Sequence, residues 1–349
     1  MTLCRGCGAV LQYDNPSAPG YTPKQGSAYC QRCFRLIHYD DLTVSMRTGI
    51  DPDSVLDRIR PMDALILWVV DLFDFEAGMI PGLARKLDGK DILLVCTKRD
   101  LLPETVSHEK VAQFVFRRLK EYGITVKELI LASGKDSTGV QDIMEAVDRL
   151  AKERPTVVMG RANSGKSTLL NRMLGEAVLT SSRYPGTTLD FNEITINGRQ
   201  FVDTPGIEIE GSILMCAEEA DLRTILPAAA VKPQIFQIHG NQTFFIGGLA
   251  RVDIRAGAKA TAVFYISEKL RLHRTKTEKA DELWEKHYGE LLQPVPAERA
   301  FAVQTVKKEF PKEDAVIDGL GWLCVSGDVS GITVHAPKGV SVTFRKAML

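Results

Sequence analysis

The chain has 349 residues, 44% of them hydrophobic, so it is long enough for two or three domains with well-buried cores. Lys and Arg total 44 and so do Asp and Glu, and this zero net charge excludes attraction of nucleic acid by overall charge. The first residues lack an apolar run of signal-peptide length, and no later stretch reaches ~18 uninterrupted apolar residues. We therefore expect a cytoplasmic protein.

The first region, residues 1–48, is poor in aliphatic residues and contains two Cys-x-x-Cys pairs. Cys4 and Cys7 form one pair and Cys30 and Cys33 the other, with 22 residues between them. This spacing is typical of a structural zinc site, in which four thiolates complete a tetrahedron. A redox dithiol would instead open a helix in a thioredoxin-like unit, and no such pattern follows either pair. The use of cysteine suits a reducing compartment.

In the second region, residues 49–212, buried-strand patterns alternate with amphipathic stretches, as in an α/β sheet with helices on both faces. The expected parallel strands are 64–71, 92–98, 128–135 and 156–163. The expected helices are 111–123, 140–153 and 166–175. Residues 191–206 are typical of a hairpin that turns at Asn197-Gly198.

Two short polar stretches follow the second and third expected strands. In the first, Thr97-Lys98-Arg99-Asp100, Asp100 can accept hydrogen bonds from the N1–H and N2–H₂ groups of guanine, a pair of donors that adenine lacks. The aliphatic stem of Lys98 can pack over the base. The second, Ser133-Gly134-Lys135, is expected to supply a backbone contact to guanine O6.

The stretch GRANSGKS, residues 160–167, matches G-x-x-x-x-G-K-[ST] and lies between an expected strand and an expected helix. In such a loop, backbone N–H groups surround phosphate oxygens and the helix N-terminus adds positive potential. Lys166 is expected to neutralise phosphate charge and Ser167 to bind Mg²⁺. A chance match in a Gly- and Ser-containing loop is the alternative. The residues expected to line the phosphates are Gly160, Arg161, Ala162, Asn163, Ser164, Gly165, Lys166, Ser167 and Thr168.

Two switch-like segments follow the phosphate loop. Asp203-Thr204-Pro205-Gly206 begins 43 residues after Gly160 and ends an expected strand. Asp203 is expected to hold Mg²⁺, and the Gly206 N–H to sense a γ-phosphate. Between the two, Thr188 in the stretch YPGTT is the expected third Mg²⁺ ligand, and the alternative is an ordinary surface threonine.

The third region, residues 213–349, consists of short β-type segments separated by glycine-rich turns, and we expect a separate, mostly β domain. The expected strands are 234–240, 242–254, 260–267 and 339–346. One helix is expected over 277–292, where Trp284 and Tyr288 lie at i and i+4 and should pack it onto the domain. Trp322 is expected in the core.

A basic cluster follows the strand expected at 260–267. It comprises Lys269, Arg271, His273, Arg274 and Lys276, to which Arg251 and Arg255 add charge. The cluster favours contact with RNA phosphates, and the alternative is a solvated strand edge protected by charge.

The five nucleotide signatures occur in the order base, base, phosphate, switch, switch, whereas an ordinary GTPase begins with the phosphate loop. A parallel sheet tolerates this change of order if the strand ends still converge on one ligand. The chain resembles a circularly permuted GTPase. With its cysteine module and β-rich tail, it resembles the YqeH family of ribosome-assembly GTPases, which is similar to the plant and mitochondrial nitric-oxide-associated proteins.

The resemblance implies GTP hydrolysis and contact with rRNA or ribosomal proteins, with the small subunit as the expected partner. Thr97 departs from the family, whose base motif usually begins with Asn, so we expect modest guanine affinity. Ile207 stands where Ras-like enzymes place the Gln that orients the attacking water, so slow intrinsic hydrolysis is expected. The resemblance also implies that Asn163 helps hold K⁺ beside the phosphates. Alternatively, Asn163 only suits the loop's backbone geometry.

Chain order adds one expectation. The segment after Gly206 runs directly into the third region, so we expect it to link hydrolysis to partner release.

Two rival functions remain. A nitric-oxide synthase would need haem and flavin sites, and the sequence contains no G-x-G-x-x-G and no cysteine in a haem-ligand context. A zinc-containing RNA-binding protein with a degenerate nucleotide site is the second, and the intact Lys166, Ser167 and Asp203 argue against it.

Overall fold

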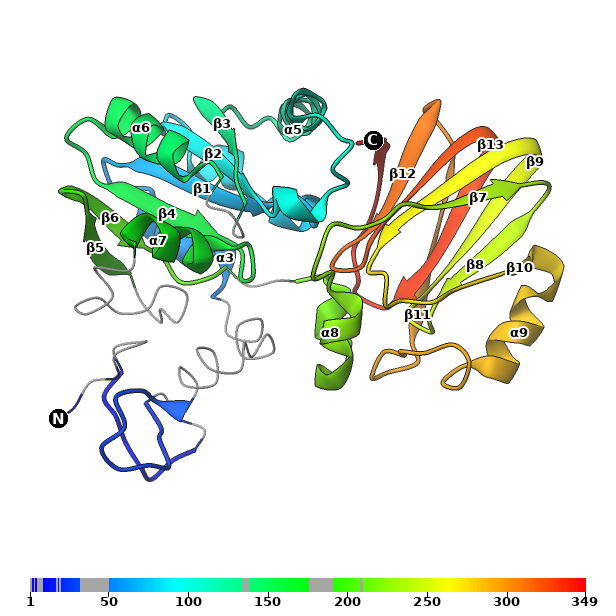
Figure 1. Ribbon diagram of the computed structural model, residues 1–349, viewed down its shortest axis with the longest axis horizontal. Helices are drawn as coiled ribbons and strands as arrows, with labels where there is room; N and C mark the ends of the chain where they lie inside the picture. Colours follow the sequence, from blue (N-terminus) through cyan, green and yellow to red (C-terminus); the bar gives the residue numbers. More distant parts are fainter. Residues whose placement is uncertain are drawn as a thin grey trace. The chain divides into compact units, whose positions relative to one another are not determined.

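The fold is described from a computed structural model of the chain (Figure 1). The structure describes residues 2, 4, 9–16, 18, 20–31, 50–133, 138–175, 191–207 and 210–349. The chain divides into two compact units. Unit 1 comprises Met1–Arg99 and Val115–Ile209, and unit 2 comprises Asp100–Phe114 and Glu210–Leu349. None of the described helices is both long and apolar enough to span a membrane.

Unit 1 is built on a six-stranded sheet with the strand order β3-β2-β1-β4-β6-β5. The strands are β1 (Leu65–Asp71), β2 (Ile92–Thr97), β3 (Glu128–Leu131), β4 (Thr156–Gly160), β5 (Asn192–Ile196) and β6 (Arg199–Asp203). All neighbours are parallel except β5 and β6, which form the expected hairpin. Asn197 at its turn has φ 48°, a left-handed conformation that Asn tolerates.

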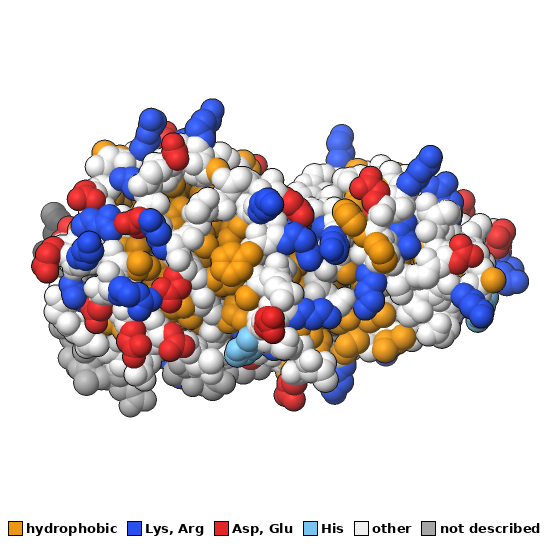
Figure 2. Space-filling model, turned by 90° about the horizontal axis from the view of Figure 1, so that it is seen from above, with side chains coloured by type: hydrophobic (Ala, Val, Ile, Leu, Met, Phe, Trp, Pro, Cys, Tyr) orange, Lys and Arg blue, Asp and Glu red, His pale blue; other side chains and the backbone are white. Residues whose placement is uncertain are grey.

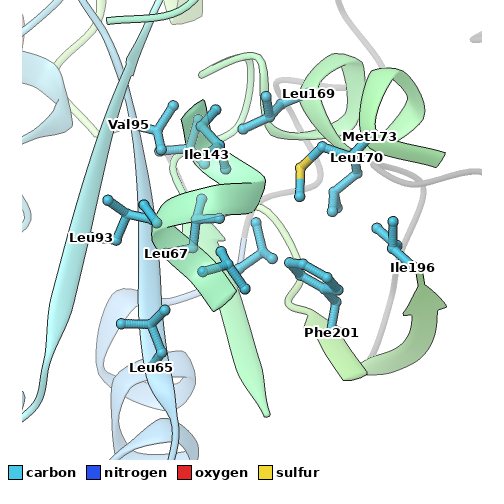
Figure 3. Packing of buried hydrophobic residues seen from close by; sticks show 14 of the residues in the cluster. Leu65, Leu67, Leu93, Val95, Ile143, Leu169, Leu170, Met173, Ile196 and Phe201 are labelled. Carbon is cyan, nitrogen blue, oxygen red and sulfur yellow. The ribbon is translucent and has the colours of Figure 1, made fainter. Parts of the chain in front are cut away.

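Helices cover the sheet, and β1, β2 and β4 are therefore runs of buried residues. The helices are α3 (Pro52–Ile59), α4 (Leu83–Lys86), α6 (Val140–Ala151), α7 (Lys166–Leu174) and the second half of α5 (His108–Glu121), whose first half belongs to unit 2. Alternate residues of β1 and β2 pack with α6 and α7 in one core cluster (Figure 3). Its labelled members are Leu65, Leu67, Leu93, Val95, Ile143, Leu169, Leu170, Met173, Ile196 and Phe201.

The strand order reverses between β1 and β4. From β1 the chain moves outward through β2 to β3, then returns to β4 on the other side of β1, continues to β5 at the edge and turns back into β6, which lies between β4 and β5. In open α/β sheets, ligands bind beyond the carboxyl ends of the strands at such a reversal. The expected α/β fold of this region is therefore confirmed, and its topology marks one edge of the sheet as the place for a site.

Unit 2 contains an eight-stranded antiparallel sheet. Six of its strands follow the order β10-β8-β9-β13-β12-β14, and the other two, β7 and β11, pair with β9 and β13. The strands are β7 (Gln234–Ile238), β8 (Gln242–Ile246), β9 (Ala250–Ile266), β10 (Leu272–Lys276), β11 (Phe301–Lys307), β12 (Lys312–Ile317), β13 (Gly321–Pro337) and β14 (Val342–Lys346). The mostly β character of the C-terminal region is confirmed.

Two strands of 17 residues, β9 and β13, pair with each other along most of their length. The first half of β9 also pairs with β8 and its second half with β7, so each half of β9 has a different second neighbour in the sheet. Their pairing shifts register between Gly327 and Gly331. The expected strands 242–254 and 260–267 were divided wrongly, because the chain turns at residues 247–249 and continues through residue 257 as one strand.

Helices α8 (Leu222–Ile225) and α9 (Ala280–His287) complete unit 2. The helix expected over 277–292 begins with a 3₁₀ turn and ends at His287. Trp284 stacks on Phe245 with ring centroids 5.3 Å apart, and Trp322 is 2% exposed and stacks on Tyr265. The packing roles expected for both tryptophans are confirmed.

Candidate functional site

The phosphate-loop sequence joins β4 to α7 at the strand-order reversal. β4 ends at Gly160, and Gly165, with φ 86°, precedes the first residue of α7. Gly160 cannot carry a side chain, because a Cβ there would lie 2.5 Å from the carbonyl oxygen of Val69 in β1. The first N–H groups of a helix have no partner within it, so the start of α7 offers donors and positive potential to an anion.

Lys166 and Asp203 meet at this loop, as the sequence predicts. The Lys166 Nζ donates a hydrogen bond to Asp203 Oδ1 at 2.5 Å and another to the carbonyl oxygen of Thr204. The two side chains are 5% and 0% exposed. Ser167, the other expected Mg²⁺ ligand described by the structure, is the second residue of α7. The groups expected to neutralise phosphate charge and to hold a cation therefore lie beside one another.

The segment that follows Asp203 is hydrogen-bonded to the phosphate loop. The Ile207 N–H donates to the carbonyl of Gly160 (3.1 Å), and the Ala162 N–H donates to the carbonyl of Ile207 (2.9 Å). On the other side, the Ile50 N–H donates to the carbonyl of Gly206 (2.9 Å). The Ile207 side chain is completely buried. Ile50 was not singled out from the sequence.

The base motif begins at the end of β2, next to the phosphate loop. The Thr97 hydroxyl donates to the carbonyl of Ser164 (2.5 Å) and lies 3.2 Å from that of Val70. A Cβ on Gly165 would lie 3.2 Å from this hydroxyl. Thr97 is 5% exposed, and its hydroxyl contacts the phosphate loop. Thr is shorter than the Asn that usually begins this motif, but it still makes the contact.

The rest of the base motif continues into a short 3₁₀ helix, η2 (Arg99–Leu101), which contains Asp100. Lys98 has φ 56°, and its Nζ donates to Asp71 Oδ2 at 2.7 Å. The Arg99 N–H donates to the carbonyl of Ala132 (3.2 Å), which joins the two expected base-reading segments. Ser133, in the second segment, is buried.

Several expected site residues lie outside the described residues. They are Gly134, Lys135 and Thr188 in the nucleotide site, and Cys7 and Cys33 in the cysteine module. Their assignments stay predictions. Asn163 and Ser164 lie inside the phosphate loop, where Asn163 has φ 61°.

The N-terminal module buries the two described cysteines of its Cys-x-x-Cys pairs. Cys4 and Cys30 are 1% and 2% exposed and pack with Leu11 in a small core. The Cys30 N–H donates to the Cys4 sulfur at 3.1 Å, a contact that stabilises a thiolate. Within the described ranges no cluster of three or more potential metal ligands occurs, since they include only half of the four cysteines. The two described cysteines fit a zinc site.

The basic cluster of unit 2 is partly as expected. Lys269, Arg271, Arg274 and Lys276 are exposed. Figure 2 shows blue basic side chains interspersed with red acidic ones on the face in view. The prediction was wrong for Arg251, which is 8% exposed and pairs with Asp253 and Asp281. Residues two apart on a strand share a face, so Arg251 and Asp253 could have been recognised as a pair.

These features define the class of the protein: a P-loop nucleotide-binding domain whose base motifs precede the phosphate loop, followed by a β domain. Comparison with known proteins agrees with this class. Residues 156–242 match the family model described as 50S ribosome-binding GTPase, and residues 259–348 match the one described as YqeH-like, C-terminal.

Three relatives place the chain within that class. It is 35% identical to YqeH of Bacillus subtilis over 99% of both chains. It is 26% identical to NO-associated protein 1, chloroplastic/mitochondrial, of Arabidopsis thaliana over 93% of this chain and 70% of that one. It is 30% identical to GTPase Der of Methylibium petroleiphilum over 48% and 40%. The chain therefore belongs to the YqeH family and carries a GTPase domain, which confirms the resemblance.

Proposed function

We propose that this protein is a GTP-binding, GTP-hydrolysing molecular switch that acts in the assembly of a ribosomal subunit. The observation that carries this is the meeting of Lys166, Asp203 and the phosphate loop where the strand order reverses, with the Thr97 hydroxyl on the same loop. The description of the matched GTPase model and the membership of the YqeH family support a ribosomal role.

In this proposal the loop N–H groups and Lys166 hold the β- and γ-phosphates, and Asp100 reads guanine. Mg²⁺ would be held by Ser167 and Asp203, with Thr188 as the third ligand, and it supplies neutralisation of the phosphate oxygens. The burial of Ile207 leaves the attacking water without a polarising side chain from that position. The intrinsic rate is therefore slow.

We further propose that K⁺ raises this rate through Asn163. The left-handed backbone of Asn163 also fits the alternative, that Asn is present for its conformation alone. The variant Asn163→Gly separates the two, because Gly adopts the same φ without strain and has no side chain to bind a cation. Turnover should be about tenfold faster in K⁺ than in Na⁺ for the wild type. The ratio should fall to about one in Asn163→Gly, and equal wild-type rates in both salts would contradict the proposal.

The domain division that goes with this function is a zinc module over 1–48, a permuted GTPase domain over 49–212 and a ribosome-contacting domain over 213–349. Cys4, Cys7, Cys30 and Cys33 are the proposed zinc ligands. The segment after Gly206 connects the nucleotide site to the C-terminal domain along the chain, so loss of the γ-phosphate would release the partner. The proposed compartment is the cytoplasm.

The ribosomal role is tested by sedimentation with purified small and large subunits, in GDP and in a non-hydrolysable GTP analogue. The family resemblance favours the small subunit, whereas the matched model names the 50S subunit, so both must be measured. We expect retention on one subunit only with the GTP analogue. Arg271→Glu combined with Arg274→Glu should weaken it, and Arg85→Glu combined with Lys120→Glu, two exposed basic residues of unit 1, is the charge-matched control. Equal sedimentation in both nucleotides would contradict the switch.

The exposed Arg271, Arg274 and Lys276 also favour a second candidate, a zinc-containing RNA-binding protein with a degenerate nucleotide site. The two candidates differ in turnover. GTP hydrolysis that is lost in Lys166→Ala excludes the second one.

A further inference from the structure

Residues 71–78, here named the loop 71–78, begin with the last residue of β1 and end with a 3₁₀ turn, and they contact three other parts of unit 1. Its first residue binds Lys98 of the base motif, and its seventh accepts a hydrogen bond from Arg161 of the phosphate loop. Glu76, between them, binds α5. The sequence DLFDFEAG carries no motif of its own, and its contacts connect the two nucleotide-binding segments.

Asp71 divides its two carboxylate oxygens between the loop and the base motif. Oδ1 accepts the backbone N–H of Phe73 at 2.8 Å, which fixes the carboxylate, and Oδ2 accepts the Lys98 Nζ at 2.7 Å. The side chains of Asp71 and Lys98 are 14% and 24% exposed. Lys98 has φ 56°, a backbone conformation that residues with a Cβ disfavour, and the ion pair fixes the end of its side chain.

Glu76 anchors the middle of the loop. Its Oε2 accepts one hydrogen bond from Arg118 Nη2 and one from Tyr122 Oη, both at 2.8 Å. Glu76 and Arg118 are 2% and 9% exposed, so the pair is shielded from water. Burial and the Glu76 charge raise the pKa of Tyr122 to about 12, so its hydroxyl remains a donor. A carboxylate that is shielded from water and accepts two hydrogen bonds keeps the loop in one position.

The Arg161 side chain completes the connection. Its Nη1 donates to the carbonyl of Ala77, although Arg161 belongs to the phosphate loop. A Cβ on the adjacent Gly78 would lie 2.6 Å from Val70 Cγ1, so the loop packs closely on β1. The loop 71–78 therefore fixes the Lys98 side chain and the phosphate loop on one support.

We propose that Asp71 is a positioning residue for guanine recognition, and that it acts by holding Lys98 so that the lysine stem lies flat over the base. This rests on the proposed GTP-binding function. Asp71 touches neither phosphate nor base in this scheme, so it determines the affinity for the nucleoside part and leaves the hydrolysis step unchanged.

The test uses the full-length protein and the variants Asp71→Asn, Lys98→Met and their combination. Asp57→Asn is the matched control, since Asp57 also binds a lysine, Lys86 at 2.9 Å, but is 61% exposed and distant in sequence from the site motifs. Dissociation constants for GDP and GTP, and kcat at saturating GTP, are measured for each. Thermal melting of each variant reports the fold.

We expect Asp71→Asn to weaken GDP and GTP binding equally, by about tenfold, with kcat unchanged. Adding Asp71→Asn to Lys98→Met should then have no further effect, because both remove one interaction. Affinity equal to that of Asp57→Asn overturns the proposal, and so does an additive double variant or an equal loss in kcat. Wild-type protein that does not prefer GDP over ADP would instead contradict the GTP-binding function itself.

Discussion

Two buried ion pairs, one in each unit, show how similar geometry serves different ends. Lys166–Asp203 in unit 1 has side chains 5% and 0% exposed, and Arg345–Asp314 in unit 2 has side chains 2% and 0% exposed. The first lies at a strand-order reversal beside the phosphate loop, where in the proposed function a phosphate binds Lys166 and a cation binds Asp203. The second pair, Arg345–Asp314, makes its described contacts with other residues of unit 2. Burial of charge alone therefore does not identify a ligand site.

The surroundings of Asp314 show why its pair is structural. Its Oδ2 accepts the backbone N–H of Met348 at 3.0 Å as well as Arg345 Nε at 3.3 Å. The guanidinium of Arg345 lies 4.6 Å from the ring centroid of Phe114, within cation–π range. Burial raises the pKa of Asp314, and Arg345 and the Met348 N–H oppose this rise. These contacts join β12, β14 and the N-terminal half of α5 within unit 2.

The largest expected effect is on the pair in unit 2. Arg345→Met leaves a buried carboxylate without its counter-charge and should lower the free energy of unfolding by about 3–5 kcal/mol. Replacing both partners, as Asp314→Leu with Arg345→Met, should cost much less. Denaturant unfolding of the full chain measures both. Lys86→Met is the control, since its partners Asp53 and Asp57 are 68% and 61% exposed and its loss should change the free energy of unfolding little. If Arg345→Met cost no more than this control, the pair would not be structural.

A smaller, pH-dependent effect is expected at Asp253, also in unit 2. Burial would raise its pKa, but hydrogen bonds from His335, Arg251 and Thr243 outweigh this and lower it from 3.8 to about 2. Its stabilisation is therefore complete above pH ~4 and is lost as the pH falls towards 2.

Asp253→Asn should then lower the free energy of unfolding by about 1–2 kcal/mol at pH 6, and the difference from wild type should shrink towards zero near pH 2. Asp281→Asn is the matched control, because it removes the other acidic partner of Arg251. The Asp281 side chain is 89% exposed, so its replacement should have little effect. Denaturant titrations at several pH values measure both. A difference that stays constant with pH would contradict the assignment.

The smallest effect is expected in unit 1, and on binding. Thr97→Val keeps the shape of the side chain and removes the hydroxyl that donates to Ser164, a loss of about 1 kcal/mol, or about fivefold in GDP affinity. Thr97→Ser keeps the hydroxyl and should bind GDP like the wild type. Equilibrium binding of a fluorescent GDP measures all three. Equal affinities for Val and Ser would show that the hydroxyl does not support the loop.

The sequence predicts unit 1 better than unit 2 for a physical reason. The parallel strands, the phosphate loop and Asp203 are local patterns, and strand ends converge in any doubly wound sheet. The Asp253 carboxylate is hydrogen-bonded to Thr243, 10 residues away, and to His335, 82 residues away. Only the register of β8, β9 and β13 brings these together, and no local pattern specifies it.

The same limit applies inside the nucleotide site. Glu76 and Arg118 are 42 residues apart, and Thr97 and Ser164 are 67 apart. Asp71 ends a buried strand as Thr97 does, and this pattern indicates a possible site residue. However, its partner Lys98 was expected to contact the base alone. Arg251 was wrongly assigned to an exposed patch. Its neighbour on the strand, Asp253, was a local signal for a pair, whereas its second acidic partner, Asp281, lies 30 residues away and was not.

We propose that the permuted nucleotide motifs build a working GTPase site. Turnover of GTP and ATP by the purified full-length protein, with Lys166→Ala as the blank, tests it most directly. We expect slow hydrolysis of GTP, none of ATP, and a loss of at least about 100-fold in the variant. Equal turnover of both nucleotides, or turnover that survives in Lys166→Ala, would contradict it.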